Sequence, residues 1–197
     1  MTKRIAQINR KTHETEISLT LNLDGSGKSS IDLPLGFLTH MLTLFAKQAR
    51  FDLAVKAKGD LQVDEHHLVE DAGIVLGQAF AKCLNDKRGI NRYGFFILPM
   101  NEVLATVAVD LSGRYSFGFN ASFTRERVGD LPTELIYDFW DAFAQNARAN
   151  LIFKIEYVRN DHHQIEAIFK AAGRAMKQAV AIDPKIKNEI PSTKGVL

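Results

Sequence analysis

The chain has 197 residues, of which 46% are hydrophobic and 24% are charged, and this composition and length suit one compact soluble domain. Its net charge of +2, from 25 basic and 23 acidic residues, gives no general electrostatic case for binding nucleic acid or a membrane. The single cysteine, Cys83, excludes an intrachain disulfide and a cysteine-rich zinc site. The sequence contains neither a signal-peptide pattern nor a stretch of roughly 18 apolar residues, so we expect a cytoplasmic protein.

The two halves of the chain carry the same order of strand and helix signals, read from alternating or helically spaced apolar residues. The first half predicts strands at residues 5–9, 16–23 and 30–33, a helix at 38–49, a strand at 53–57 and a helix at 66–84. The second half predicts strands at residues 93–98, 102–111 and 115–119, a helix at 134–150, a strand at 152–157 and a helix at 162–181. Asp64 and Asn160 are the expected N-caps of the two helices that begin with a pair of histidines.

Two pairs of similar segments indicate an internal duplication. Residues 45–50 (FAKQAR) resemble residues 143–148 (FAQNAR), and the motif His-His-x-x-Glu at residues 66–70 returns at residues 162–166. Strands that lead into a helix–strand–helix unit, twice over, predict a single α+β domain (1–197) with two similar halves, about 1–90 and 91–197. The simplest packing is a split β-α-β arrangement, in which helices cover one face of each sheet.

The duplicated His-His-x-x-Glu motif predicts a metal site. Residues four apart on a helix share a face, so His66 can converge with Glu70, and His162 with Glu166. The second histidine of each pair points about 100° away, where it could serve a second metal or face an interface. Imidazole with carboxylate and no thiolate favours Mn or Fe. One copy of the motif has too few ligands to enclose an ion, so the two copies must come together within or between subunits.

A short glycine-rich segment, GSGKS at residues 25–29, resembles the end of a phosphate-binding P-loop. That motif requires glycine at the position of Asn22 and a helix after Ser29, and neither is present. We therefore expect these residues to form a hairpin turn.

Beyond these patterns, the chain resembles the imidazoleglycerol-phosphate dehydratase family over essentially its whole length and in order. The segments that carry the resemblance are LGFLTHML (35–42), DEHHLVED (64–71), PMNE (99–102), LSGR (111–114), NDHHQIEA (160–167) and PSTKGVL (191–197). The resemblance implies a fold of the ribosomal protein S5 domain 2-like type.

The resemblance also implies two Mn²⁺ ions in each active site. The implied ligands are His40, His66, His67, Glu70, Asp138, His162, His163 and Glu166. Asp138, the counterpart of His40 in the repeat, stands where most family members have histidine. A carboxylate can still bind Mn²⁺, so we expect metal binding with an altered affinity. The alternative is that Asp138 is a solvated helix residue and that water takes the ligand's place.

The family resemblance further assigns residues to the substrate and its phosphate group. The implied contacts are Glu14, Gln48, Arg92, Arg114, Lys170, Ser192 and Lys194. Arginine and lysine suit phosphate, and the C-terminal segment (residues 191–197) is expected to close over it. Gln48 replaces a histidine often found in the family. Glu14 is the candidate general base, and Glu70 and Glu166 are expected to act in catalysis through the metals.

The implied reaction is loss of water from D-erythro-imidazole glycerol phosphate to give imidazole acetol phosphate in histidine biosynthesis. Two metals bound to the imidazolate form of the substrate would stabilise the charge that develops when a poorly acidic carbon loses its proton. The resemblance also implies a homo-oligomer of 24 subunits built from trimers. Two other classes stay open from the residues alone: a di-metal hydrolase of phosphate esters, and a non-catalytic metal-binding assembly protein.

Overall fold

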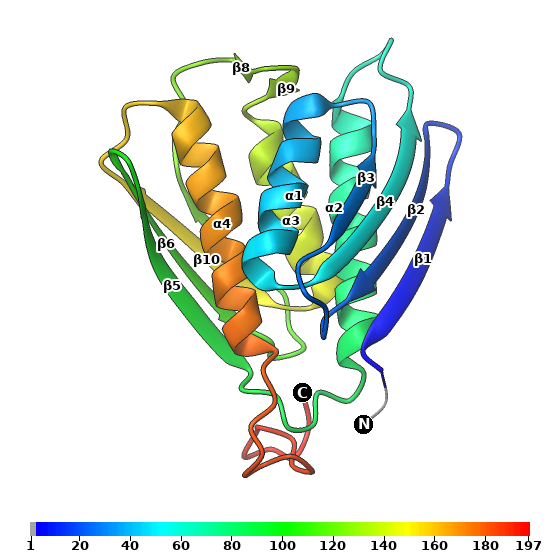
Figure 1. Ribbon diagram of the computed structural model, residues 1–197, viewed down its shortest axis with the longest axis vertical. Coiled ribbons are helices and arrows are strands. Elements are labelled where there is room, and N and C mark those ends of the chain that lie inside the picture. Colours follow the sequence, from blue (N-terminus) through cyan, green and yellow to red (C-terminus); the bar gives the residue numbers. More distant parts are fainter. Residues whose placement is uncertain (1–2) are drawn as a thin grey trace.

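The computed structural model describes residues 3–197 and places four helices between two four-stranded sheets (Figure 1). Each sheet therefore has one face on the helices and one face open. The inner face is apolar because the strands alternate: in the strand Thr15–Asn22, Ile17, Leu19 and Leu21 are at most 2% exposed, whereas Glu16 faces outward. The expected α+β architecture is confirmed. No helix within residues 3–197 is long and apolar enough to span a membrane.

The first half forms one sheet and two helices. Its strands are β1 (Ile5–Lys11), β2 (Thr15–Asn22), β3 (Ser29–Asp32) and β4 (Asp52–Gly59), in the spatial order β1-β2-β4-β3. Strands β3 and β4 are parallel and are joined by α1 (Gly36–Ala49), while the other pairs are antiparallel. Helix α2 (His66–Leu84) follows β4. This is the split β-α-β arrangement that the sequence predicted.

The second half repeats the same topology. Its strands are β5 (Tyr93–Met100), β6 (Val103–Asp110), β7 (Ser116–Asn120) and β10 (Asn150–Glu156), in the order β5-β6-β10-β7, with helices α3 (Leu135–Ala147) and α4 (Asp161–Ala179). The predicted helices were correct in kind, although the last two end two to three residues earlier than expected. A small hairpin of β8 (Arg127–Val128) and β9 (Leu131–Pro132) was missed, because two-residue strands carry no periodicity.

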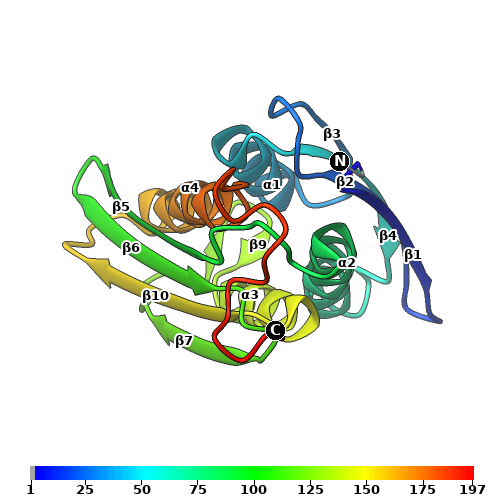
Figure 2. The ribbon, with the colours of Figure 1, turned by 90° about the horizontal axis from the view of Figure 1, so that it is seen from below.

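The helices pair across the two halves. Helix α1 packs on α4, and α2 packs on α3, so each pair combines one helix from each half (Figures 1 and 2). All four helices begin at the same end of the molecule, at the top of Figure 1. The start of β1 and the C-terminal end of the chain lie at the other end. The first turns of α2 and α4, which carry the histidine pairs, therefore lie at one end of the helical layer.

Two equivalent glycines set the distance between the paired helices. A Cβ atom on Gly77 of α2 would lie 2.5 Å from the carbonyl oxygen of Phe143 on α3. A Cβ atom on Gly173 of α4 would lie 2.8 Å from the carbonyl oxygen of Phe45 on α1. Real Cβ atoms do not approach an oxygen so closely, so only glycine allows these backbones to meet.

Both histidine pairs begin a helix that is capped from two residues earlier. The backbone N–H of His66 donates to Asp64, at 3.1 Å, and that of His162 donates to Asn160, at 2.9 Å. Asn160 is the N-cap of α4, as expected. For α2 the N-cap position is Glu65, so the prediction for Asp64 was wrong by one residue although its side chain does accept the hydrogen bond.

The close approach of the helices yields a stability prediction. We expect Gly77→Ala to lower the free energy of unfolding by about 2 kcal/mol, because overpacking against Phe143 outweighs the better helix propensity of alanine. Gly36→Ala is the matched control, since its Cβ would meet only the side chain of Asp130, at 3.4 Å. Urea denaturation at neutral pH measures both variants. A Gly77→Ala protein as stable as the parent would contradict this account of the helix pair.

Candidate metal centre and anion pocket

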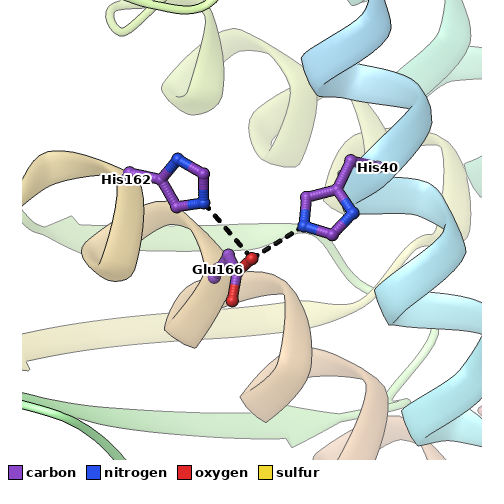
Figure 3. A group of neighbouring side chains, drawn as sticks. All are labelled: His40, His162 and Glu166. Carbon is purple, nitrogen blue, oxygen red and sulfur yellow. Dashed lines mark hydrogen bonds and ion pairs between the residues drawn. The ribbon is translucent and has the colours of Figure 1, made fainter.

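Three predicted metal ligands meet where α1 packs on α4 (Figure 3). Nε2 of His40 lies 2.7 Å from Oε1 of Glu166, and Nε2 of His162 lies 3.3 Å from the same oxygen. One possible ligand atom from each residue lies within 4.8 Å of the other two. The carboxylate is 9% exposed while the two imidazoles are 46% and 43% exposed, so the cluster has a buried base and an open side.

Local helix geometry and the duplicated glycine together build this cluster. His162 and Glu166 are four residues apart on α4 and so share a face. His40 comes from the other half of the chain and reaches Glu166 because α1 lies close against Gly173. Two imidazoles and one carboxylate form a donor set that suits a divalent metal such as Mn²⁺.

Glu166 is ionised by its surroundings. Its burial would raise the pKa of the carboxyl, but hydrogen bonds from Lys170, His40 and His162 outweigh the burial and hold that pKa below its usual range. Lys170, which the family resemblance assigns to the substrate, donates to Oε2 of Glu166 at 2.6 Å. Within this subunit Lys170 therefore stabilises the carboxylate of the cluster.

The counterpart cluster in the first half is looser. Nε2 of His66 lies 3.9 Å from Oε2 of Glu70, and both side chains are nearly half exposed. Asp138 lies in the first turn of α3, half-buried. Among residues 3–197, only His40, His162 and Glu166 bring three possible ligand atoms together, so Asp138 forms no such group with His66 and Glu70 here.

The second histidine of each pair faces a carboxylate near the edge of its own sheet. Nδ1 of His67 lies 3.1 Å from Asp60 and its Nε2 lies 3.8 Å from Oε1 of Glu14, on the loop between β1 and β2. Nδ1 of His163 lies 3.2 Å from Glu102, on the loop between β5 and β6. The hydrogen bond to Asp60, with smaller contributions from Glu14, raises the pKa of His67 above its ordinary value.

Sequence reasoning did not single out Asp60 or Glu102 as partners of these histidines. Both hold a ring nitrogen of a predicted metal ligand and so orient its imidazole. Glu102 lies within the PMNE segment of the family resemblance, which was a usable signal. Asp60 directly follows β4 and carries no pattern that distinguishes it from other loop acids.

Four of the predicted substrate contacts line a separate cavity of about 360 Å³. These residues are Arg92, Arg114, Ser192 and Lys194. Arg92 is held in place by Asp110, at 2.7 and 3.1 Å, and by the carbonyl of Pro191, at 3.0 Å. The C-terminal segment therefore packs against Arg92, and it crosses the near side of the molecule in Figure 2, which is seen from below. We call this cavity the anion pocket.

The candidate metal cluster and the anion pocket lie at opposite ends of the subunit. His162 is in the first turn of α4, a helix of 19 residues, whereas the anion pocket lies beyond its other end. Such a helix is about 28 Å long. Gln48 lies near the lower end of α1, where its Cβ packs close to Gly173. One subunit therefore does not bring the predicted metal ligands and the predicted phosphate contacts to one place.

The glycine-rich loop of the first half, residues 25–29, binds a carboxylate of the protein itself, that of Asp52. The backbone N–H groups of Ser26, Gly27 and Lys28 donate to Oδ1 of Asp52 at 2.8, 3.2 and 3.0 Å. The predicted hairpin turn was wrong, because β3 pairs with β4 and not with β2. The residue equivalent to Asp52 is Asn150, at the start of β10.

The equivalent loop in the second half is held by a side chain that donates hydrogen bonds, whereas Asp52 accepts them. Nδ2 of Asn150 donates to the carbonyl of Arg114 at 2.7 Å and to the hydroxyl of Ser112 at 3.3 Å. An amide that donates thus replaces a carboxylate that accepts. Ser112, Gly113 and Arg114 line the anion pocket. The second copy of the loop therefore borders the pocket without a carboxylate of its own.

Two similar halves with a histidine and glutamate cluster between their helices define a duplicated α+β protein with a candidate metal centre. The family model described as imidazoleglycerol-phosphate dehydratase matches residues 34–176. The chain belongs to the imidazoleglycerol-phosphate dehydratase family and is an enzyme, a dehydratase of histidine biosynthesis.

Individual relatives agree with this assignment over their full lengths. An imidazoleglycerol-phosphate dehydratase from Clostridium novyi is 55% identical over 197 residues, which are 100% of both chains. The crystal structure of the Staphylococcus aureus enzyme has a TM-score of 0.83 at 40% identity and covers 91% of this chain and 99% of its own. The Pyrococcus furiosus structure, in complex with (S)-C348, has a TM-score of 0.82 at 33% identity, with 96% and 100% covered.

The loop that binds Asp52 yields a prediction of pH dependence. The backbone donors lower the pKa of Asp52 from its ordinary value of 3.8, with Lys28 the largest contributor. Because the folded-state pKa is lowered, the stability that Asp52 adds is complete above pH 3.8 and is lost as the pH falls through the lowered pKa. We expect Asp52→Ala to destabilise the protein at pH 7, with the difference shrinking in acid. Urea denaturation at several pH values tests this, and a difference independent of pH would contradict it.

Proposed function

We propose that this enzyme removes water from D-erythro-imidazole glycerol phosphate to give imidazole acetol phosphate, in the cytoplasm, at a site that holds two Mn²⁺ ions. The observation that carries the proposal is the cluster of His40, His162 and Glu166, in a chain whose relatives are imidazoleglycerol-phosphate dehydratases. Neutral imidazoles and an ionised carboxylate are ligands for Mn²⁺, and Cys83, the single cysteine, is buried.

The proposed metal ligands fall into two groups on each subunit. One group is the cluster just named, and its counterpart is His66, Glu70 and Asp138. The two remaining proposed ligands, His67 and His163, lie outside both groups and face acidic residues on nearby loops. When bound, the two ions would take up the imidazolate form of the substrate and stabilise negative charge on it. The role of the protein is to hold these side chains in position for the two ions.

Glu14 is the proposed general base. Its carboxylate lies 3.8 Å from Nε2 of His67, and its side chain is 53% exposed, so a substrate beside His67 would be within its reach. The backbone around it is ordered: the N–H groups of Glu14 and Thr15 donate to the hydroxyl of Thr12 at 3.0 and 2.9 Å. Oε1 of Glu14 would receive the proton removed from carbon.

The anion pocket is the proposed site for the phosphate group of the substrate. Arg92, Arg114 and Lys194 supply positive charge, and Ser192 supplies a hydroxyl. Gln48 and Lys170 are proposed to contact the part of the substrate that lies between its phosphate group and its imidazole ring. Since the pocket and the cluster of one subunit lie about 28 Å apart along α4, the complete site requires residues from neighbouring subunits. The homo-oligomer of 24 subunits, built from trimers, which the family resemblance implies, is the assembly that we propose to complete the site.

The metal assignment is tested with Glu166→Gln, which keeps the size of the side chain and removes its charge. We expect turnover of imidazole glycerol phosphate to fall by at least about 100-fold, together with a loss of bound Mn²⁺, because the buried carboxylate joins both imidazoles. Glu189→Gln is the control, since Glu189 is an exposed acid near the other end of the molecule. Metal analysis and product formation are measured together.

The outcomes of this experiment separate the proposed function from its rivals. Normal turnover in Glu166→Gln would refute the metal assignment. Release of inorganic phosphate from the substrate by the parent protein would instead indicate a hydrolase, and metal binding without any turnover would indicate an assembly protein.

Asp138 yields a separate prediction. If its carboxylate is a ligand, Asp138→Ala should weaken Mn²⁺ binding by about tenfold, and Asp138→His should restore or exceed the parent affinity, because imidazole is an equally good donor. Titration with Mn²⁺, followed by calorimetry, measures all three proteins. Equal affinities in the parent and Asp138→Ala would show that water serves in place of this side chain.

A further inference from the structure

Lys87 is a buried lysine in the linker between the two halves. Lys87 is only 8% exposed, and its Nζ donates to the carbonyl oxygen of Leu111 at 3.1 Å. Within residues 3–197 it forms no ion pair, and the nearby carboxylate of Asp110 is engaged by Arg92. Buried lysines are uncommon unless a negative charge accompanies them. This one has an ammonium group with donors to spare and no carboxylate in contact.

The backbone takes an unfavourable conformation to place this lysine. Lys87 has φ of 60°, in the left-handed region that costs free energy for any residue with a side chain. Arg92, which lines the anion pocket, has φ of 69°. Two cations of one linker are thus held in left-handed conformations. Strain of this kind persists where surrounding contacts impose it, and it is concentrated at functional sites.

Lys87 lies directly behind the wall of the anion pocket. Leu111, whose carbonyl it holds, is followed by Ser112, Gly113 and Arg114, which line that pocket. A Cβ atom on Gly113 would lie 2.5 Å from the backbone carbon of Leu197, which lines the pocket, and 3.4 Å from Nζ of Lys87. The ammonium group is therefore separated from the pocket by a single turn of backbone without a side chain at its centre.

The surroundings of Lys87 favour an additional negative charge. Burial lowers the pKa of its amine; Asp110 partly offsets this, and the positive charges of Arg148 and Arg92 lower the pKa further. An anion in the pocket would compensate the excess positive charge. The residue at the equivalent place after α4 is Asp183, an acid.

We propose that Lys87 is a positioning residue of the anion pocket, which holds the turn at residues 112–114 through Leu111 and adds a buried positive charge that strengthens binding of the substrate's phosphate group. This inference rests on the proposed function. It assigns a role to a residue that does not itself line the pocket. Charge acts across the thin wall because Lys87 itself is buried, and electrostatic interactions of a buried group are stronger than those in water.

The test separates charge from hydrogen bonding. Lys87→Gln keeps a donor for Leu111 but removes the charge, and Lys87→Arg keeps the charge. Lys185→Met is the control, because Lys185 is exposed and outside the pocket. Kinetics with imidazole glycerol phosphate, inhibition by inorganic phosphate and thermal melting are measured on each Mn²⁺-loaded protein. We expect Lys87→Gln to raise KM and the phosphate inhibition constant about tenfold with a much smaller change in kcat, and Lys87→Arg to stay close to the parent.

The contrary results are distinct. A Lys87→Gln protein that melts earlier but has the parent's phosphate inhibition constant would show a purely structural role and overturn the inference. Equal losses in Lys87→Gln and Lys87→Arg would also overturn it, because charge would then not be the property that matters. A parent protein without dehydratase activity would overturn the proposed function itself, whereas an active parent with unchanged variants overturns only the role of Lys87.

Discussion

The contact between a glycine on one helix and the backbone of its partner is the constraint on which the rest of this structure depends. Gly173 brings α4 against α1, and Gly77 brings α2 against α3. Each pair joins helices from different halves, so neither half can complete its helical layer alone. The approach of His40 to Glu166 is a direct result, because the two residues are 126 positions apart in the chain.

Local sequence patterns predicted the helices, the strands and the His-His-x-x-Glu motif. They did not predict how the helices pack over long range. The helix at His66–Leu84 was predicted to the residue, because helical periodicity and the histidine pair mark its start. The spacing of His162 and Glu166 is likewise a property of one helix. The sequence did not show which helices pair across the halves. That pairing is decided by close approaches such as Gly173 on Phe45, which only the folded chain reveals.

The same distinction explains what was and was not foreseen at the candidate site. The resemblance named Arg92, Arg114 and Lys194 together, and the fold does gather them in one cavity. It also named Lys170, which in this subunit is held by Glu166. The cavity and the histidine cluster lie at opposite ends of the helices. The residue identities alone did not reveal this separation. Partners such as Asp60 share no motif with the histidines they hold.

The exchange of Asp52 for Asn150 means that the two halves are not interchangeable parts. A symmetrical chain made of two copies of the first half would keep the glycine contacts and the helix pairs, yet each of its loops would be closed by an internal carboxylate. A chain made of two second halves would hold both loops through the donating amide of an asparagine, and neither loop would have a carboxylate of its own. The loop of the first half is therefore fastened to the scaffold by its own carboxylate, whereas the loop of the second half forms part of the wall of a cavity.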